Sequence, residues 1–332
     1  MKRDRSQSLG MLRFITLMLF MVGVSPLLRS QVVGGKAGQP SAASQPLNFL
    51  VISDWGRDGI NDKEKKTPGQ LKVAKQFAAT AKEIKASFVV TCGDNFHGKG
   101  VPGPKDPLWS ENFEKVYSQE ALMIPWYITL GNHDYEGSVE AELEYARTSG
   151  RWTQPGRYYA FTKELPDSTT ALFLVLDSSP LVQQYIDDTH DQHHVKGQDT
   201  AAQARWCERT LGASKATWKF VFFHHPAYSA SSTHGDTAEI QSTFVPLFEK
   251  YHVDACFSGH DHDLQHSHPD HSTIEYFGVG GGSDTRPAGQ AAFTRFSRAS
   301  LGFGAVSVLP HAATVSYINE KGEQIYSYTL RK

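Results

Sequence analysis

Short apolar runs alternate along the chain with longer segments whose apolar residues recur at helical spacing. The runs 48–53 (NFLVIS) and 87–92 (SFVVTC) predict two buried strands. Between them, segment 68–86 places Leu71, Ala74 and Phe77 on one face of a predicted helix. This region therefore predicts a strand, a helix and a second strand.

The same alternation continues to about residue 258. It predicts a helix over 109–121, a strand over 124–130, a helix over 138–149, adjacent strands over 157–165 and 169–177, a polar loop over 178–198, a helix over 200–212, a strand over 218–223, a helix over 236–251 and a strand over 253–258. From residue 273 onward, strand follows strand with turns between them. Such a pattern predicts a mixed α/β protein with a large, partly parallel sheet system.

Length and composition narrow the class of protein. A chain of 332 residues is long enough for one large, enzyme-sized domain. Its 33 basic and 35 acidic side chains give a net charge of -2, so no electrostatic footprint for nucleic acid or anionic lipid is expected. An anionic substrate must therefore be held by a local site. The three cysteines, Cys92, Cys207 and Cys256, lie in apolar or helical segments, and we expect them to pack in the core.

The N-terminal segment resembles a targeting sequence. Residues 1–30 have the layout of a secretory signal peptide, in which basic residues precede an apolar run, 14–24, that is short for a membrane span. An uncleaved N-terminal anchor is the alternative. Residues 31–46 predict a linker, and 47–332 predict the folded domain. We accordingly expect a secreted or periplasmic protein with no stable membrane association after cleavage.

Polar side chains follow five of the predicted strands, at the end where ligands gather in open α/β sheets. They are Asp54, the segment Asp94–His97, the segment Asn132–Asp134, the pair His224–His225, and the segment His260–His262. Each of these alone is more often a turn, a helix cap or a surface loop than a set of ligands. Their shared position is what predicts a common metal site.

The donor types indicate which metals fit. Carboxylate and amide oxygens together with imidazole nitrogens suit zinc, iron or manganese. There are more donors than one tetrahedral ion with an open position needs, whereas two ions about 3.5–4 Å apart would use them all. Asp94 is the natural bridge, because one carboxylate carries two donor oxygens.

Five motifs in this order resemble those of a known family: DWG (54–56), GDNF (93–96), GNHD (131–134), HHP (224–226) and GHDH (259–262). The chain resembles the dimetal, calcineurin-like metallophosphoesterases, and specifically the small mammalian-type purple acid phosphatases, also called tartrate-resistant acid phosphatases. The resemblance covers about 47–330. It implies an α/β fold of four layers, α/β/β/α, in which two central mixed β-sheets are flanked by helices and the metals lie at one edge of the sandwich.

The resemblance also implies a ligand set. One ion would be held by Asp54, Asp94 and His262, and the other by Asp94, Asn132, His224 and His260. Purple acid phosphatases have a tyrosine at position 97, whose phenolate binds ferric iron and gives the colour. Many other metallophosphoesterases instead have a histidine at the position of Gly56. Because one ion is otherwise a ligand short, we expect His97 to bind it and to favour a divalent pair of ions.

The activity implied by the resemblance is that of an acid phosphatase, which cleaves phosphate monoesters by attack of a metal-bound hydroxide on phosphorus. His133 would bind a phosphate oxygen or protonate the leaving group, and Asp134 would orient His133 or cap a helix. His234 matches a family position for a second such histidine. Thr233 stands where mammalian enzymes have a glutamate, so His234 would carry more of the proton transfer, unless it is only a surface-loop residue.

Two other functions stay open at this stage: a phosphodiesterase on the same dimetal site, and a non-catalytic scaffold on this fold. The histidine-rich segment 187–199 invites a third metal site, but a solvated loop is the preferred interpretation. The glycine-rich segment 278–284 lacks the Gly-Lys-Ser/Thr ending of a phosphate loop and predicts a turn. We expect small-molecule phosphate esters as partners, no nucleic acid, and a monomer.

Overall fold

The computed structural model describes residues 45–56 and 69–332. The predicted signal peptide, and the predicted linker apart from its last two residues, lie outside the described residues. The strands that precede the candidate donors are β1 (Leu47–Ile52), β2 (Phe88–Thr91), β3 (Trp126–Tyr127), β7 (Trp218–Phe222) and β8 (Ala255–Ser258). The other strands are β4 (Trp152–Thr153), β5 (Tyr159–Glu164), β6 (Thr170–Val175), β9 (Leu264–Ser267), β10 (Glu275–Val279), β11 (Thr294–Arg298), β12 (Gly302–Leu309), β13 (Ala312–Asn319) and β14 (Gln324–Arg331).

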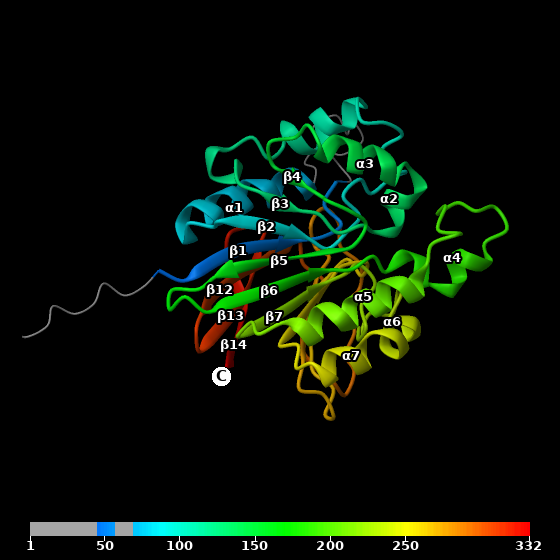
Figure 1. The fold of residues 1–332 in the computed structure, drawn as a ribbon. Helices are drawn as coiled ribbons and strands as arrows, with labels where there is room; N and C mark the ends of the chain where they lie inside the picture. Colours follow the sequence, from blue (N-terminus) through cyan, green and yellow to red (C-terminus); the bar gives the residue numbers. More distant parts are fainter. Residues whose placement is uncertain (1–44, 57–68) are drawn as a thin grey trace, which may run out of the picture. The chain divides into compact units, whose positions relative to one another are not determined.

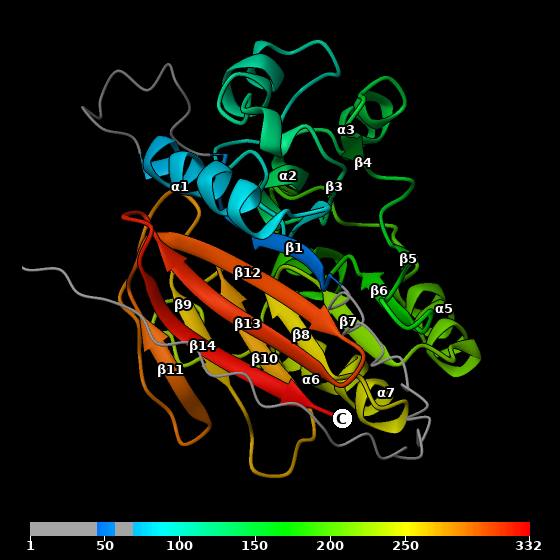
Figure 2. The ribbon, with the colours of Figure 1, turned by 90° about the vertical axis from the view of Figure 1, so that its left-hand side faces the viewer.

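These strands form two mixed sheets of seven strands each. The first has the order β14-β13-β12-β1-β2-β3-β4, and the second has the order β11-β9-β10-β8-β7-β6-β5. In the first sheet β1 to β4 run parallel, and in the second β6, β7, β8 and β10 do so. Figure 2 shows β12, β13 and β14 as one layer in front of β8, β9 and β10. Parallel strands end at the same sheet edge, so the residues after them are brought together.

An aromatic core joins the two sheets face to face. Phe49 and Phe88 of the first sheet are fully buried, and the Phe49 ring meets that of Phe173 in the second sheet edge to face, with centroids 5.4 Å apart. Phe222 and Phe257 continue this layer. Burying each such ring stabilises the fold by about 1.5–3 kcal/mol.

Helices cover the outer faces of both sheets. The helices are α1 (Gly69–Ile84), α2 (Asn132–Glu136), α3 (Val139–Ala146), α4 (Gln183–Asp187), α5 (Thr200–Ala213), α6 (Ala238–Thr243) and α7 (Val245–Lys250). Val73 and Phe77 of α1 are buried in the cluster on the outer face of the first sheet, and Leu211 of α5 and Phe248 of α7 in that of the second. Figure 1 shows α1 on one side of the strands and α5 to α7 on the other. The predicted four-layer α/β/β/α fold is confirmed.

Several predicted elements are shorter or broken. The helix predicted over 236–251 is two helices, α6 and α7, because Pro246 at the start of α7 cannot donate a backbone hydrogen bond to the preceding turn. The helix predicted over 109–121 consists of a π-helix (Trp109–Glu114) and a 3-10 turn (Glu120–Leu122). The loop predicted over 178–198 contains a 3-10 turn (Ser179–Leu181) and α4, whereas β4, β9 and β11 were not predicted.

The three cysteines are buried and free, as expected for core residues. Within the described ranges, 45–56 and 69–332, the helices are all too short or too polar to traverse a bilayer.

Candidate metal centre

The donor side chains meet where the parallel strands of both sheets end. Asp54 follows β1 and Asp94 follows β2, while His224 follows β7 and His260 follows β8. Hydrogen bonds join the two sheets here: the backbone N–H of His260 donates to Asp54 Oδ2 at 3.0 Å, and His224 Nδ1 lies 2.8 Å from the carbonyl oxygen of Cys92. Because Cys92 O can only accept, His224 carries a proton on Nδ1, and its Nε2 faces the site.

Three of these residues have an unusual backbone conformation. Asp54, Asp94 and His260 have φ values of 55°, 50° and 69°. This left-handed region is sparsely populated by residues other than glycine, and such strain concentrates at functional sites. Glycines leave room for the carboxylates: a Cβ on Gly131 would lie 2.2 Å from Asp94 Oδ1, and one on Gly259 would lie 2.6 Å from Asp54 Oδ2. The backbone here is shaped around the two carboxylates.

The first half of the site contains Asp54, His97 and His262, all buried. Asp54 Oδ1 lies 3.4 Å from His262 Nε2, and the rings of His97 and His262 are 4.8 Å apart. Among the described residues, Asp54 Oδ1 and His97 Nε2 have no hydrogen-bond partner. A buried polar atom without a partner is costly, so atoms of this kind aimed into one site indicate a bound cation.

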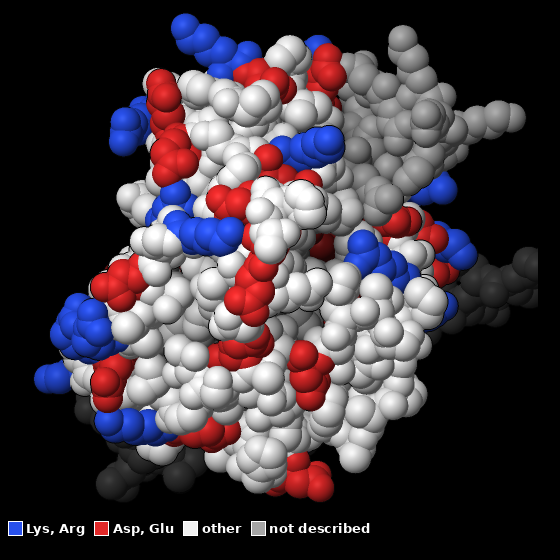
Figure 3. All heavy atoms as spheres, turned by 90° about the vertical axis from the view of Figure 1, so that its right-hand side faces the viewer, with Lys and Arg blue, Asp and Glu red and all other residues white. Residues whose placement is uncertain are grey.

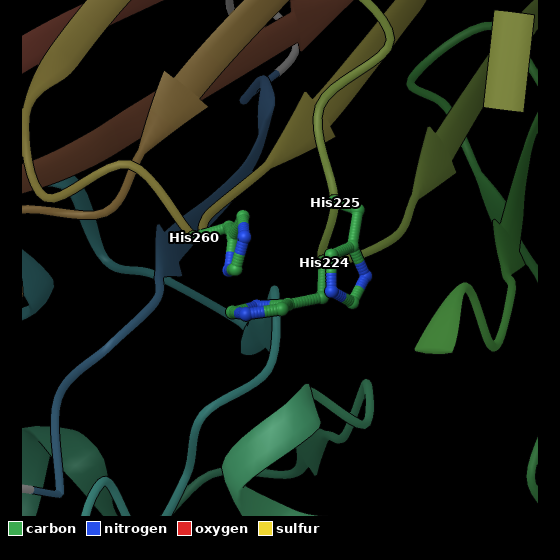
Figure 4. Close-up of side chains that lie close together, drawn as sticks. All are labelled: His224, His225 and His260. Atoms are coloured by element: carbon green, nitrogen blue, oxygen red, sulfur yellow. The ribbon is translucent and has the colours of Figure 1, made fainter. Parts of the chain in front are cut away.

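The second half contains Asn132, His224 and His260. His224 Nε2 lies 3.0 Å from Asn132 Oδ1 and 3.4 Å from Asp94 Oδ1. Figure 4 shows the rings of His224, His225 and His260 gathered beyond the strands that carry them. Ligand atoms about 2.0–2.2 Å from one ion lie about 2.8–3.6 Å from one another in octahedral or tetrahedral geometry. The measured separations match that spacing.

Asp94 connects the two halves. Its Oδ1 faces His224, and its Oδ2 lies 3.7 Å from His97 Nε2 and 3.9 Å from His133 Nε2. Burial opposes the ionisation of Asp94, but the nearby imidazoles, His224 above all, hold its pKa well below the ordinary value. Burial lowers the pKa of His224, yet the charge of Asp94 outweighs it and raises that pKa to about 9. A cation bound by Asp94 and His224 would take the place of the proton that His224 Nε2 otherwise holds beside Asp94.

The positions where sequence reasoning left a ligand in doubt are 97 and 56. A Cβ on Gly56 would lie 1.7 Å from the carbonyl oxygen of Asn95, so no side chain fits at position 56 in this backbone. His97 is buried beside Asp94, and burial lowers its pKa to about 4, which leaves the ring neutral and able to bind a metal. The donor set, with His97 included, fits two metal ions.

His133 lies beside this cluster at the start of α2. Its backbone N–H donates to Asp94 Oδ1 at 3.0 Å, and its Nδ1 lies 2.9 Å from Glu136 Oε1, one helical turn later. Asp134 has the capping role, one of the two expected for it. Its Oδ2 accepts hydrogen bonds from the backbone of Gly131 at 2.8 Å and from the side chain of Asn95 at 3.0 Å, which caps α2. The acidic neighbour of His133 is therefore Glu136, which sequence reasoning missed, although the i, i+3 spacing in a short helix was visible.

The other predicted histidines differ in their surroundings. His234 stacks on His260, with ring centroids 3.9 Å apart, and its Nε2 lies within hydrogen-bond distance of the guanidinium of Arg286. His225 is held on both nitrogens, by Ser178 Oγ at 2.8 Å and by the Tyr185 hydroxyl at 3.1 Å. His225 therefore lines the site without a free lone pair for a metal.

A cavity of about 450 Å³ opens over the cluster. Its wall includes His133, Glu136, His234 and Arg286, together with His193 from the histidine-rich segment 187–199. His193 is only 14% exposed and lies 3.8 Å from Glu136, whereas His190 and His194 are largely exposed. The segment is thus solvated at His190 and His194, whereas His193 forms part of the cavity wall.

Figure 3, which views the side where α4 lies in Figure 1, shows acidic and basic side chains interspersed among the described residues, with no large patch of one sign.

Comparison with known proteins places this site in a family. Residues 47–264 match the model of the calcineurin-like phosphoesterases. The chain belongs to this family. It is 30% identical to purple acid phosphatase 4 of Arabidopsis thaliana, over 98% of this chain and 95% of that one, and 30% identical to mouse tartrate-resistant acid phosphatase type 5, over 87% and 92%. The chain is therefore a purple acid phosphatase-like metallophosphoesterase, and the predicted resemblance is confirmed.

Solved structures show the same fold. The GAP50 protein, described as the anchor in the inner membrane complex of Plasmodium, is 24% identical, with a TM-score of 0.73 and coverage of 86% of this chain and 88% of that one. A purple acid phosphatase from yellow lupin seeds is 16% identical, with a TM-score of 0.65 over 87% of this chain and 54% of that one. At these identities the two structures support the architecture alone.

Proposed function

We propose that this protein hydrolyses phosphate monoesters at the candidate metal centre, in the manner of an acid phosphatase. One ion would be held by Asp54, Asp94, His97 and His262, and the other by Asp94, Asn132, His224 and His260. The observation that carries the proposal is the meeting of these seven side chains from five strand ends, with the oxygens of Asp94 facing donors of both halves. The acid phosphatases among the relatives support the reaction type.

Two bound cations would supply charge to orient a phosphate group and to acidify a water molecule. The side chains around them have their own tasks. The side chain of His133 is 24% exposed and lines the cavity. Glu136 lies beside its Nδ1, so its Nε2 is directed towards the site. His133 would therefore bind a phosphate oxygen or give a proton to the leaving alcohol at Nε2. Glu136, whose Oε1 lies 2.9 Å from Nδ1, would help to orient the ring through its charge.

The decisive experiment combines elemental analysis with a phosphatase pH profile on one purified sample. We expect about two metal ions per chain and turnover of a phosphomonoester that is lost on chelation and regained with iron, zinc or manganese. A phosphodiester assayed side by side tests the phosphodiesterase alternative. Activity that stays at background after reconstitution with all three metals would contradict the proposal and favour a non-catalytic scaffold.

His97 suggests that the pair of ions is divalent. A neutral imidazole stabilises a trivalent ion less than an anionic phenolate does, so the wild-type protein should lack a purple charge-transfer band. His97→Tyr, loaded with iron, should gain visible absorption, because the phenolate is then placed beside Asp94. His97→Phe, which has the ring without the hydroxyl, is the matched control. A strong visible band in the wild-type protein would contradict this assignment.

We further propose that the protein is exported and acts as a monomer on small phosphate esters. The layout of residues 1–30 supports export, and the net charge of -2 gives no support for a nucleic-acid partner. Mass analysis of the N-terminus of exported protein, together with its mass in solution, tests both points. An intact N-terminus on membrane-bound protein would favour the uncleaved anchor.

A further inference from the structure

One cationic side chain lies in the wall of the cavity and has no part in the ligand set. Among the described residues that line the cavity, Arg286 is the only lysine or arginine, while Glu136, Asp236 and Glu239 are acidic residues outside the ligand set. Arg286 belongs to the loop after β10, and its backbone N–H donates to the carbonyl oxygen of His262 at 2.9 Å. This bond ties the loop to the strand end that carries the candidate ligands.

The guanidinium of Arg286 is held in place by His234. Arginine has no acceptor, so Nη1 of Arg286 donates and Nε2 of His234 accepts. His234 is itself fixed, because its ring stacks on His260 and its backbone N–H donates to Asp261 Oδ1 at 3.3 Å. In this arrangement His234 Nε2 has no proton to give, and the side chain is placed to position Arg286.

This arrangement affects which phosphate esters can bind, because monoesters and diesters differ in their number of terminal oxygens. A phosphate monoester has three terminal oxygens, whereas a diester has two. If the two ions engage two oxygens, a monoester keeps a third, negatively charged oxygen that a guanidinium can bind, and a diester keeps none. An arginine recognises such an oxygen better than any other side chain, because its donors are planar and always charged.

We propose that Arg286, positioned by His234, binds the third terminal oxygen of a phosphate monoester and thereby selects monoesters over diesters. The inference rests on the proposed function and specifies its substrate class. It also accounts for a cation in the wall of a cavity that has three carboxylates outside the ligand set, which are otherwise unfavourable to an anionic substrate.

The test compares Arg286→Gln and Arg286→Lys with wild type on p-nitrophenyl phosphate and bis(p-nitrophenyl) phosphate, which share a leaving group. A lost charge-assisted hydrogen bond should lower kcat/KM for the monoester by about 10- to 100-fold in Arg286→Gln, with less than about a 3-fold change for the diester. Arg286→Lys keeps the charge and should fall between. Equal losses on both esters, or no loss on either, would overturn the proposal.

His234 variants separate positioning from proton transfer. His234→Ala should reproduce part of the loss on the monoester, and His234→Gln, which keeps an acceptor oxygen, should restore part of it. A proton-donor role would instead lower kcat in both variants and on both esters. That pattern would overturn the positioning role.

Calorimetry on metal-loaded protein gives a readout that does not need turnover. Arg286→Gln should bind inorganic phosphate about 10- to 100-fold more weakly than wild type, whereas dimethyl phosphate, with two terminal oxygens, should bind equally to both. Wild type that binds phosphate in this Arg286-dependent way but turns over neither ester would contradict the proposed function and support the inference. Binding of phosphate that is independent of Arg286 would overturn the inference.

Discussion

Among the described residues, two buried groups of histidines and carboxylates can be compared, the candidate metal cluster and a second place with different polar contacts. The metal cluster consists of Asp54, Asp94, His97, Asn132, His224, His260 and His262. The second place, here called the Glu275 network, consists of His266, Glu275, Arg295, Tyr326 and Tyr328. It connects β9, β10 and β11 of the second sheet with β14 of the first. Residue type alone therefore does not distinguish a metal site from a structural network.

The two places differ in how their polar atoms are satisfied. In the Glu275 network, His266 Nε2 donates to Glu275 Oε2 at 2.8 Å, and His266 Nδ1 accepts from the Tyr326 hydroxyl at 2.7 Å. Glu275 Oε1 accepts from Arg295 and from Tyr328, both at 2.8 Å. In the metal cluster, Asp54 Oδ1 and His97 Nε2 are buried without a hydrogen-bond partner among the described residues. In the Glu275 network the unpartnered atom is His268 Nδ1, 3.1 Å from Glu275 Oε2, and that carboxylate is otherwise satisfied by protein donors, whereas the unpartnered atoms of the metal cluster would be satisfied by a cation.

The largest expected effect is that of Asp94→Ala. Loss of the carboxylate that faces both halves of the metal cluster should remove both ions and lower turnover by on the order of 10³-fold or more. Activity and elemental analysis on the same sample measure this. Asp94→Asn is the companion variant, because asparagine tolerates the positive φ of position 94 and loses only the charge. Near-normal turnover in either folded variant would contradict the two-ion assignment.

His133→Ala tests whether His133 acts on the substrate or is itself a metal ligand. If His133 acts on substrate, kcat should fall by about 10²-fold or more while metal content stays at the wild-type level. Glu136→Gln keeps the shape of the neighbour at His133 Nδ1 and should lower kcat by a smaller factor. A fall in metal content in His133→Ala would show instead that His133 is a ligand, as its 3.9 Å distance from Asp94 also allows.

That the side chains of the metal cluster lie close together was largely predictable from the sequence, for a physical reason. Its members directly follow parallel strands, and the topology of a parallel sheet brings the residues after such strands to one edge. Arg286 and His193 lie in loops, whose path depends on tertiary contacts that no local period reveals. The Glu275 network was hidden as well, because β9 and β11 are short and their polar residues carry no repeating pattern. The pairing of sheets was inferred only from the family resemblance.

Glu275→Gln should have the next largest effect, and on stability alone. An amide presents a donor where Glu275 accepts from His266, Arg295 and Tyr328, so a buried mismatch of about 2–3 kcal/mol is expected. Denaturant unfolding measures it, and metal content and kcat should not change. The matched control is Glu140→Gln, which removes an exposed ion pair with Arg157 and should cost less than about 1 kcal/mol. A loss of metal in Glu275→Gln would contradict this prediction and show that metal binding depends on the Glu275 network.

The smallest effect is the pH dependence of the Glu275 network. Burial raises the pKa of Glu275, but the hydrogen bonds from His266 and Tyr328 outweigh it and lower that pKa below its ordinary value. Burial also lowers the pKa of His266, although Glu275 opposes this shift. A group whose pKa is lower in the folded than in the unfolded state contributes stability above its unfolded-state pKa, and this contribution is lost as the pH falls through the folded-state pKa.

Both shifts have the same sign, so the network should contribute most at pH 7 and above and progressively less between about pH 7 and pH 4, where free histidine and glutamate titrate. The measurement is the difference in unfolding free energy between wild type and a double variant, His266→Gln with Glu275→Gln, across that range. The metal cluster titrates equally in both proteins, so its contribution cancels. A difference that grows on acidification would mean that the imidazolium form of His266 is the one stabilised, and that the Glu275 network attracts positive charge as the metal cluster does.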